Sequence, residues 1–397
     1  MQFRRLFFLP LFLLLARDAL SATVLVVQFY NGSPFRDLNW VGESVAETLR
    51  GEFSAASQIV LERDSLQEAM RHLSLRPDAN FTKATLIRLG QTLDADYICY
   101  GSYQANLPVG HTELKESSVQ LTAHYIDLRK LHDGPDIAET GKLADLSRLE
   151  EHLAWQSLKY LQPDANLPLE QFLSPQKFIR LDAEESYARG LLSSNKDQQQ
   201  QWFMQAVALD PQFARPAFEL GKIYLQHHDY RQAVQWFQRV SPAHSRYGEA
   251  RFYMGLSAYQ MADYNAAVNY FREVLKLFPM NEVYNNLAAA ELQLNMPGAV
   301  DDFRRAMEGD PADTTYLFNL GAALLKADRF DEASTRLQAV LDRNPNDAEA
   351  HTLLERAKKR EQVSVDPKPF VTERLKQSLD YTAFRQLKAM LQPKGGS

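Results

Sequence analysis

The sequence predicts two folded units, an α/β domain at the amino-terminal end and an all-α helical solenoid behind it. Residues 23–161 alternate short apolar runs with amphipathic stretches, whereas residues 181–347 repeat small and aromatic residues at a nearly constant interval. Of the 397 residues 45% are hydrophobic, which is enough for more than one core.

The elements of the first unit follow from their hydrophobic patterns. Strands are expected at 23–31, 58–65, 95–107, 118–130 and 137–146, and helices at 38–53, 66–73, 82–93 and 148–161. The later strands alternate apolar and polar residues and are joined by turn-rich segments, which predicts an antiparallel meander. Strand–helix units followed by a meander predict an α/β sandwich over residues 23–161.

The second unit contains a repeat, visible in the stretch 253–271. Gly255 and Ala267 are small, and Phe271 is large. Equivalent large residues recur after 34, 34, 32 and 34 positions, at Phe203, Phe237, Phe271, Phe303 and Leu337. A period of this length indicates a helical solenoid. The pattern resembles tetratricopeptide repeats, with five helix pairs over 181–347 and a capping helix over 348–362.

The small residues of the repeat have a packing explanation. Gly255 and Ala267 are expected where two helix axes cross closely, so that a larger side chain would cost about 1–3 kcal/mol of overpacking strain. Phe271 would fill the space against the next pair, and Pro279 would end the second helix. The pattern therefore predicts a core and not a cofactor site.

The resemblance implies that the first helices of the pairs line a concave, protein-binding groove. The candidate groove residues are apolar or aromatic side chains outside the packing positions and two asparagines suited to a peptide backbone: Phe218, Phe252, Leu256, Tyr259, Asn286, Phe318 and Asn319. Some relatives clamp an acidic chain terminus with lysines, but Phe252 and Thr315 occupy two of those places here. We therefore expect an extended apolar peptide as ligand; the alternative is that some aromatics pack on the tail or are only half-buried.

Three amino-terminal segments, "VVQFYN", "WVGESVAETL" and "LGQTLDADYICYGSY", resemble the TolB-type amino-terminal domain, also seen in FlgO-like envelope proteins. The resemblance covers about residues 23–130. It implies an exported domain that acts by protein–protein contact and has no catalytic constellation. For Trp40, Gly42 and Glu43 it implies a structural role where the first helix begins.

The first 22 residues have the layout of a signal peptide, with a basic start, an apolar run and small residues before Thr23. The apolar run is shorter than the roughly 20 residues that a membrane-spanning helix needs. We therefore expect cleavage and a protein that is periplasmic or secreted, with envelope association as a further option. The alternative is an uncleaved anchor, because Leu20 is large for a position near the cleavage site.

Two further segments are distinguished by their composition, one rich in proline and one with a net positive charge. Residues 162–180 contain three prolines and are predicted to be a linker. From Glu355 onward ten basic and five acidic residues give +5, although the whole chain carries −6. The tail, 363–397, also has a helix-like apolar pattern: Phe370, Leu375, Leu379, Phe384 and Leu387. We expect it to occupy the groove part of the time; the alternative is a solvated tail.

Several chemistries are disfavoured. The acidic balance argues against general nucleic-acid binding, and the single Cys99 cannot form a disulfide framework. The segment 134–143 fails the spacing of a phosphate-binding loop, and the nine histidines are scattered. We therefore expect a non-catalytic scaffold without metal or cofactor. The alternative is a ligand sensor or enzyme with its site at the loop 31–37, which lies between a strand and a helix as many α/β ligand sites do.

Overall fold

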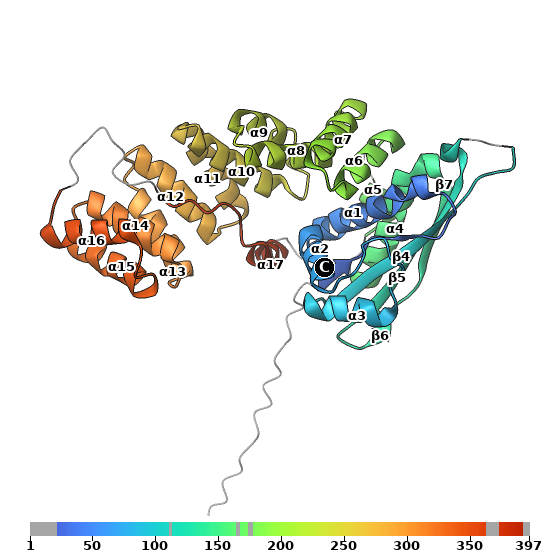
Figure 1. The fold of residues 1–397 in the computed structure, drawn as a ribbon, viewed down its shortest axis with the longest axis horizontal. Helices are drawn as coiled ribbons and strands as arrows, with labels where there is room; N and C mark the ends of the chain where they lie inside the picture. Colours follow the sequence, from blue (N-terminus) through green and yellow to red (C-terminus); the bar gives the residue numbers. More distant parts are fainter. Residues whose placement is uncertain (1–21, 111–112, 164–166, 174–177, 363–372, 392–397) are drawn as a thin grey trace, which may run out of the picture.

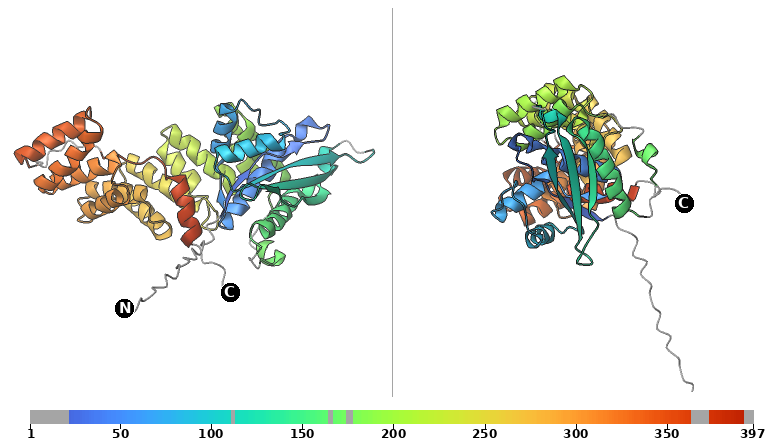
Figure 2. Two further views of the ribbon diagram at one scale, coloured as in Figure 1. Left: turned by 90° about the horizontal axis from the view of Figure 1, so that it is seen from below. Right: turned by 90° about the vertical axis from the view of Figure 1, so that its right-hand side faces the viewer.

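The computed structural model describes residues 22–110, 113–163, 167–173, 178–362 and 373–391. It consists of an α/β domain followed by an arch of helices, which confirms the predicted fold class (Figures 1 and 2). Within these residues no helix combines the length and the apolar character needed to cross a membrane. The predicted signal segment, except Ala22, and Phe370 lie outside the described residues.

A seven-stranded mixed sheet forms the centre of the α/β domain. Its strands are β1 (Thr23–Val26), β2 (Tyr30–Asn31), β3 (Ile59–Val60), β4 (Tyr97–Asn106), β5 (Ser118–Asp127), β6 (His132–Asp133) and β7 (Ile137–Lys142). β1 pairs in parallel with β3 and β4, and β4, β5 and β7 form the expected antiparallel meander. The segment 134–143, tested above against a phosphate loop, is largely strand β7.

Helices cover both faces of this sheet. The helices α1 (Trp40–Ala55) and α4 (Leu146–Leu161) lie on one face, and α2 (Arg63–His72) and α3 (Lys83–Thr92) on the other. Successive side chains of a strand point to opposite faces, so Val24 and Val26 join the core under α1 and α4, whereas Leu25 joins the core under α2 and α3. The uninterrupted apolar run at the start of this domain follows from this double coverage.

The expected strand 23–31 is divided into β1 and β2, the expected strand 58–65 is reduced to β3 because α2 begins at Arg63, and the expected strand 137–146 ends at Lys142. After β1, the amide of Phe29 donates to the carbonyl of Gly42 at 3.1 Å, which brings the turn against α1. A Cβ on Gly42 would lie 2.0 Å from the carbonyl oxygen of Phe29. Gly42 therefore permits this close approach. Trp40 is buried in the same core.

Cys99 lies on β4 with its side chain fully buried. Burial raises the pKa of its thiol to about 12, because a thiolate would lose its hydration. The thiol therefore stays protonated and behaves as a small core residue.

The solenoid consists of five helix pairs and a further helix. The pairs are α6 (Leu181–Leu192) with α7 (Lys196–Leu209), α8 (Ala214–Gln226) with α9 (Tyr230–Phe237), α10 (Tyr247–Gln260) with α11 (Tyr264–Leu277), α12 (Asn281–Gln293) with α13 (Ala299–Gly309), and α14 (Thr314–Lys326) with α15 (Phe330–Arg343); α16 (Ala348–Lys359) follows. A Cβ on Gly255 would lie 2.6 Å from the ring of Phe271, and one on Gly221 equally close to Phe237. The small residues therefore stand where the large residue of the partner helix packs.

The solenoid begins directly against the α/β domain. The short helix α5 (Leu169–Leu173) lies within the stretch expected as a linker, and the indole of Trp155 donates to the carbonyl of Leu167 at 2.8 Å. The guanidinium of Arg63 donates to the carbonyl of Leu191 on α6 at 2.7 Å. Arg63 also pairs with buried Glu43 at 2.7 Å. Although burial alone would raise the pKa of Glu43, Arg63 and Arg50 hold it below its ordinary value.

Three buried carboxyl groups lie at this same junction. Thr48 of α1 donates to Glu150 of α4 at 2.7 Å and accepts from Arg215 of α8 at 3.0 Å. Burial raises the pKa of Glu150, Glu151 and Glu184, and for Glu151 the value is about 8. Each of these three carboxyls has one oxygen without a hydrogen-bond partner. We therefore expect the stability of this junction to depend on whether its carboxyl groups are protonated.

Candidate functional site: the groove and its strap

Residues 373–380, here called the strap, lie across the first helices of the later pairs and lead into the last helix, α17 (Tyr381–Leu391). Figure 1 shows this segment returning along the inner side of the arch to α17. The groove formed by α10, α12 and α14 thus has an occupant that belongs to the chain itself.

Asparagine side chains bind the main chain of the strap. The amide group of Asn286 donates to the carbonyl of Lys376 at 2.8 Å and accepts from its N–H at 2.9 Å. Asn319 makes the same two bonds with Arg374, at 2.8 and 2.9 Å. Asn285 donates to the carbonyl of Arg374 at 3.0 Å and accepts from Asn319 at 2.8 Å. The amide groups of these three buried asparagines form hydrogen bonds with the main-chain N–H and C=O groups of two strap residues, so these bonds do not depend on the identity of the strap side chains.

The two basic side chains of the strap are held by carboxylates. Arg374 donates to both oxygens of Asp347, at 2.7 and 2.8 Å, and to Glu349 at 2.8 Å. Its guanidinium carbon lies 3.5 Å from the ring centre of Phe318. Lys376 pairs with Asp313. The hydrogen bonds from Arg374 lower the pKa of Asp347.

Polar contacts also fix the two ends of the strap. The carboxylate of Glu373 accepts from the hydroxyl of Tyr259 and from the amide of Gln293, each at 2.7 Å. At the other end the N–H of Asp380 donates to Glu282 at 2.9 Å. Glu373 is only 8% exposed, so its position depends on these partners.

Apolar side chains of the same segment pack on the repeat core. Leu379 and Phe384 are buried in the cluster formed by α10, α11 and α12, and Leu375 packs beside them. The rings of Phe278 and Phe384 meet edge to face at 4.5 Å between centres. Helix α17 also contacts strand β3 of the α/β domain. The tail therefore joins the groove to the first domain.

Comparison with known families identifies the helix pairs. Two models described as tetratricopeptide repeat match residues 253–314 and 292–357. Residues 253–357 are tetratricopeptide repeats. The TolB-type resemblance of the first domain has no counterpart among these matches, and no curated protein matches the chain.

Three solved structures are similar to part of this chain, and two of them, YrrB and OM64, are described as a tetratricopeptide protein or domain. YrrB, described as having an unusual peptide-binding site, is 20% identical, with 45% of this chain and 92% of that chain covered and a TM-score of 0.40. MamA from Desulfovibrio magneticus RS-1 is 17% identical, with 42% and 96% covered and a TM-score of 0.38. The OM64 domain from Arabidopsis is 29% identical, with 28% and 94% covered and a TM-score of 0.27.

Four of the seven groove residues expected from the sequence contact the strap. They are Tyr259, Asn286, Phe318 and Asn319. Asn286 and Asn319 bind main-chain groups of the strap.

The other three lie in the repeat core. Phe218 meets Phe237 at 5.6 Å, Phe252 meets Phe271 at 5.9 Å, and Leu256 is buried beside them. Phe218 and Phe252 both precede the small residue of their helix by three positions, as Phe318 does, and all three rings are buried in the repeat core. The ring of Phe318 also lies under the guanidinium of Arg374. The expectation that these two rings form an open stripe with Phe318 is therefore wrong.

The acidic side of the groove was not expected from the sequence. Asp313 caps α14 and Asp347 caps α16, each accepting N–H bonds from the first turn of its helix, and each also binds a basic strap residue. They are 34 positions apart, 347 minus 313, which is the period of the repeat. That spacing was a usable signal, but a capping role alone accounts for aspartate at this place.

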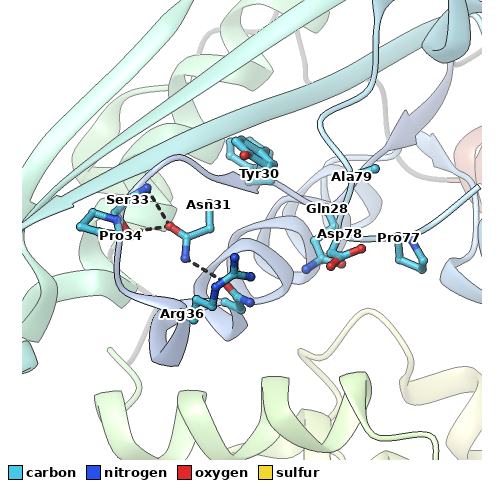
Figure 3. Close-up of a pocket in the computed structure, with 11 residues that line it drawn as sticks. Gln28, Tyr30, Asn31, Ser33, Pro34, Arg36, Pro77, Asp78 and Ala79 are labelled. Atoms are coloured by element: carbon cyan, nitrogen blue, oxygen red, sulfur yellow. Dashed lines mark hydrogen bonds between the residues drawn. The ribbon is translucent and has the colours of Figure 1, made fainter.

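The loop 31–37, the alternative site, borders a hollow of about 280 Å³ in the α/β domain (Figure 3). The amide of Asn31 is engaged within the loop, donating to Phe35 and Asn39 and accepting from Ser33. Arg36 and Asp78 at its rim are exposed. Among the described residues no cluster of three or more histidine, cysteine or acidic side chains is placed to hold a metal.

Proposed function

We propose that the protein is a non-catalytic scaffold that binds a partner protein through the groove of its tetratricopeptide repeats, and that the strap competes for the same place. The observation that carries this proposal is the pair of closed hydrogen-bond contacts from Asn286 and Asn319 to the strap backbone. Contacts to main-chain atoms hold any extended segment of suitable shape, so the groove is built to bind a peptide.

The α/β domain extends this proposal. Its TolB-like segments and the signal-like residues 1–22 favour an exported protein whose first domain contacts a second partner in the cell envelope. The direct packing of α1 on α6 supports a fixed relation between the two binding units.

The proposal is tested with the full chain and with a variant that loosens the strap, Arg374→Ala with Lys376→Ala, here called the open variant. Both are used to capture proteins from envelope extract, and captured partners are then titrated individually. We expect the open variant to bind a groove partner more tightly, because the strap no longer competes. Adding Asn286→Ala and Asn319→Ala should weaken that binding again.

A different result would redirect the search. A partner that binds all these variants equally does not use the groove, and the α/β domain with its loop 31–37 then becomes the candidate site. Changing exposed Arg36 to Ala would test that loop without disturbing the repeats.

A further inference from the structure

The strap shows which peptide the groove accepts, an inference that rests on the proposed function. Between Glu373 and Asp380 its sequence reads ERLKQSLD. Arg374 and Lys376 are two positions apart, and both are bound through the main chain and through the side chain. In an extended chain, residues two apart point to the same side. One side of the strap therefore presents two cations to the groove.

Carboxylates from two successive repeats bind these cations, Asp347 binding Arg374 and Asp313 binding Lys376. Asp313 caps α14 and Asp347 caps α16, and these helices are one repeat apart, so the repeat itself sets the separation of the two carboxylates. The carboxylate of each aspartate also accepts a hydrogen bond from an N–H of the helix that it caps, and this bond holds the side chain in the same orientation with or without a ligand. Glu349 adds a further negative charge beside Asp347.

The geometry around Arg374 restricts the type of side chain more strongly than the geometry around Lys376 does. Arg374 spreads its guanidinium over the face of Phe318 while both of its terminal nitrogens reach Asp347. A planar, forked donor fits this arrangement, whereas an ammonium provides a single point charge. Lys376 lies near one carboxylate and 4.7 Å from the ring centre of Tyr316.

Apolar positions complete the pattern. Leu375, between the two basic residues, packs against the cores on both sides of the strap, and Leu379 is buried three positions after Lys376. Gln377 and Ser378, between Lys376 and Leu379, are exposed.

We propose that the groove selects partner segments of basic character with the order arginine, leucine-like residue, lysine, two unrestricted residues and leucine-like residue. This replaces the purely apolar ligand expected from the sequence. The strap is the intramolecular copy of that ligand. A partner with an acidic or uncharged segment would leave Asp313 and Asp347 facing the peptide without a counter-charge.

The test uses a labelled, end-capped peptide of residues 372–380 and the full chain carrying the open variant. Binding is measured by fluorescence anisotropy at low and at high salt. A second peptide carries Arg374→Glu and Lys376→Glu, and a third carries Gln377→Ala and Ser378→Ala. A matched protein control, Lys358→Ala with Lys359→Ala, loses the same charge from exposed positions on α16 and keeps its strap.

We expect the natural and the third peptide to bind the open variant alike, and the charge-reversed peptide to bind at least about tenfold more weakly, because it puts like charges together. High salt should reduce the difference. The control protein should bind all peptides more weakly than the open variant does. Equal binding of natural and charge-reversed peptides would overturn the basic selectivity and leave the groove as a peptide site. Absence of binding by every peptide would overturn both proposals.

Discussion

The side-chain amide of Asn286 and the main chain of Lys376 form a closed pair of hydrogen bonds, 2.8 and 2.9 Å long. Asn319 forms the equivalent pair with Arg374, two residues earlier. The groove therefore binds its occupant in the way that one strand binds another, but with side chains of two helices supplying the partner groups.

Replacing both asparagines should release the strap. In Asn286→Ala with Asn319→Ala, the main chain of Lys376 loses both of its partners. The N–H of Arg374 loses its acceptor, and its carbonyl keeps only the bond from Asn285. Each lost bond removes about 0.5–1.5 kcal/mol. Hydrogen exchange at strap amides should therefore accelerate by tenfold or more.

The matched control is Asn269→Ala, an exposed asparagine on α11. It should leave strap exchange unchanged. If the double variant exchanged at the same rate as the control, the asparagines would not be what holds the strap.

A second prediction concerns the packing of the repeats. Gly255→Leu would place a side chain where the ring of Phe271 lies, because even a Cβ atom on residue 255 would be 2.6 Å from that ring. Phe271→Ala would leave a cavity, since Phe271 is fully buried, and should cost about 3–5 kcal/mol. Both variants of the full chain should unfold at lower temperature than exposed Gln260→Ala in calorimetry. Identical transitions for all three would contradict the close helix crossing.

The repeat was predictable because its signals are local and recur. The sizes of three residues, Gly255, Ala267 and Phe271, are enough to predict a helix crossing, and five copies of this pattern establish the period of the repeat. Asn286 and Asn319 were proposed as groove residues because an amide side chain can both donate to and accept from a peptide backbone. Phe218 and Phe252 were misplaced because hydrophobicity does not say which side of a helix an aromatic ring faces when both sides are occupied.

Long-range pairings were harder to predict. Asp347 reads as a helix cap in sequence, and its contact with Arg374 spans 27 residues. The positive charge and apolar pattern of the chain end led us to expect a tail that occupies the groove, but they do not indicate which carboxylates bind its basic side chains. Similarly, nothing local in Glu150, Glu151 and Glu184 predicts that the α/β domain and the first repeats bury all three.

A third prediction concerns processing of the amino terminus. The basic start, apolar run and small residues of 1–22 should direct export and cleavage next to Thr23 when the full chain is expressed in a Gram-negative host. Amino-terminal sequencing of the periplasmic fraction measures this directly. Replacing Ala22 by a bulky residue should slow cleavage. Recovery of intact Met1 from the cytosol would contradict export.

The last prediction concerns pH and the junction between α4 and the repeats. Burial, with the nearby Glu52 carboxylate, raises the pKa of Glu151 to about 8, whereas an exposed glutamate titrates near 4.5. The folded state therefore binds a proton that the unfolded chain releases. This favours folding fully below about pH 4.5, and the advantage is lost as pH rises toward 8. Each unit of difference corresponds to about 1.4 kcal/mol.

Glu151→Gln should remove this dependence, because the amide is neutral at every pH. We expect the free energy of unfolding of the natural chain to fall between pH 5 and pH 9 by more than that of the variant, measured by urea titration at several pH values. Glu170→Gln, an exposed change on α5, is the matched control and should follow the natural chain. Glu184 and Glu150, whose pKa values burial also raises, leave a residual slope in the variant. If Glu151→Gln and Glu170→Gln gave the same slope, Glu151 would be ionised in the folded protein and paired with Arg215, whose charge favours that form.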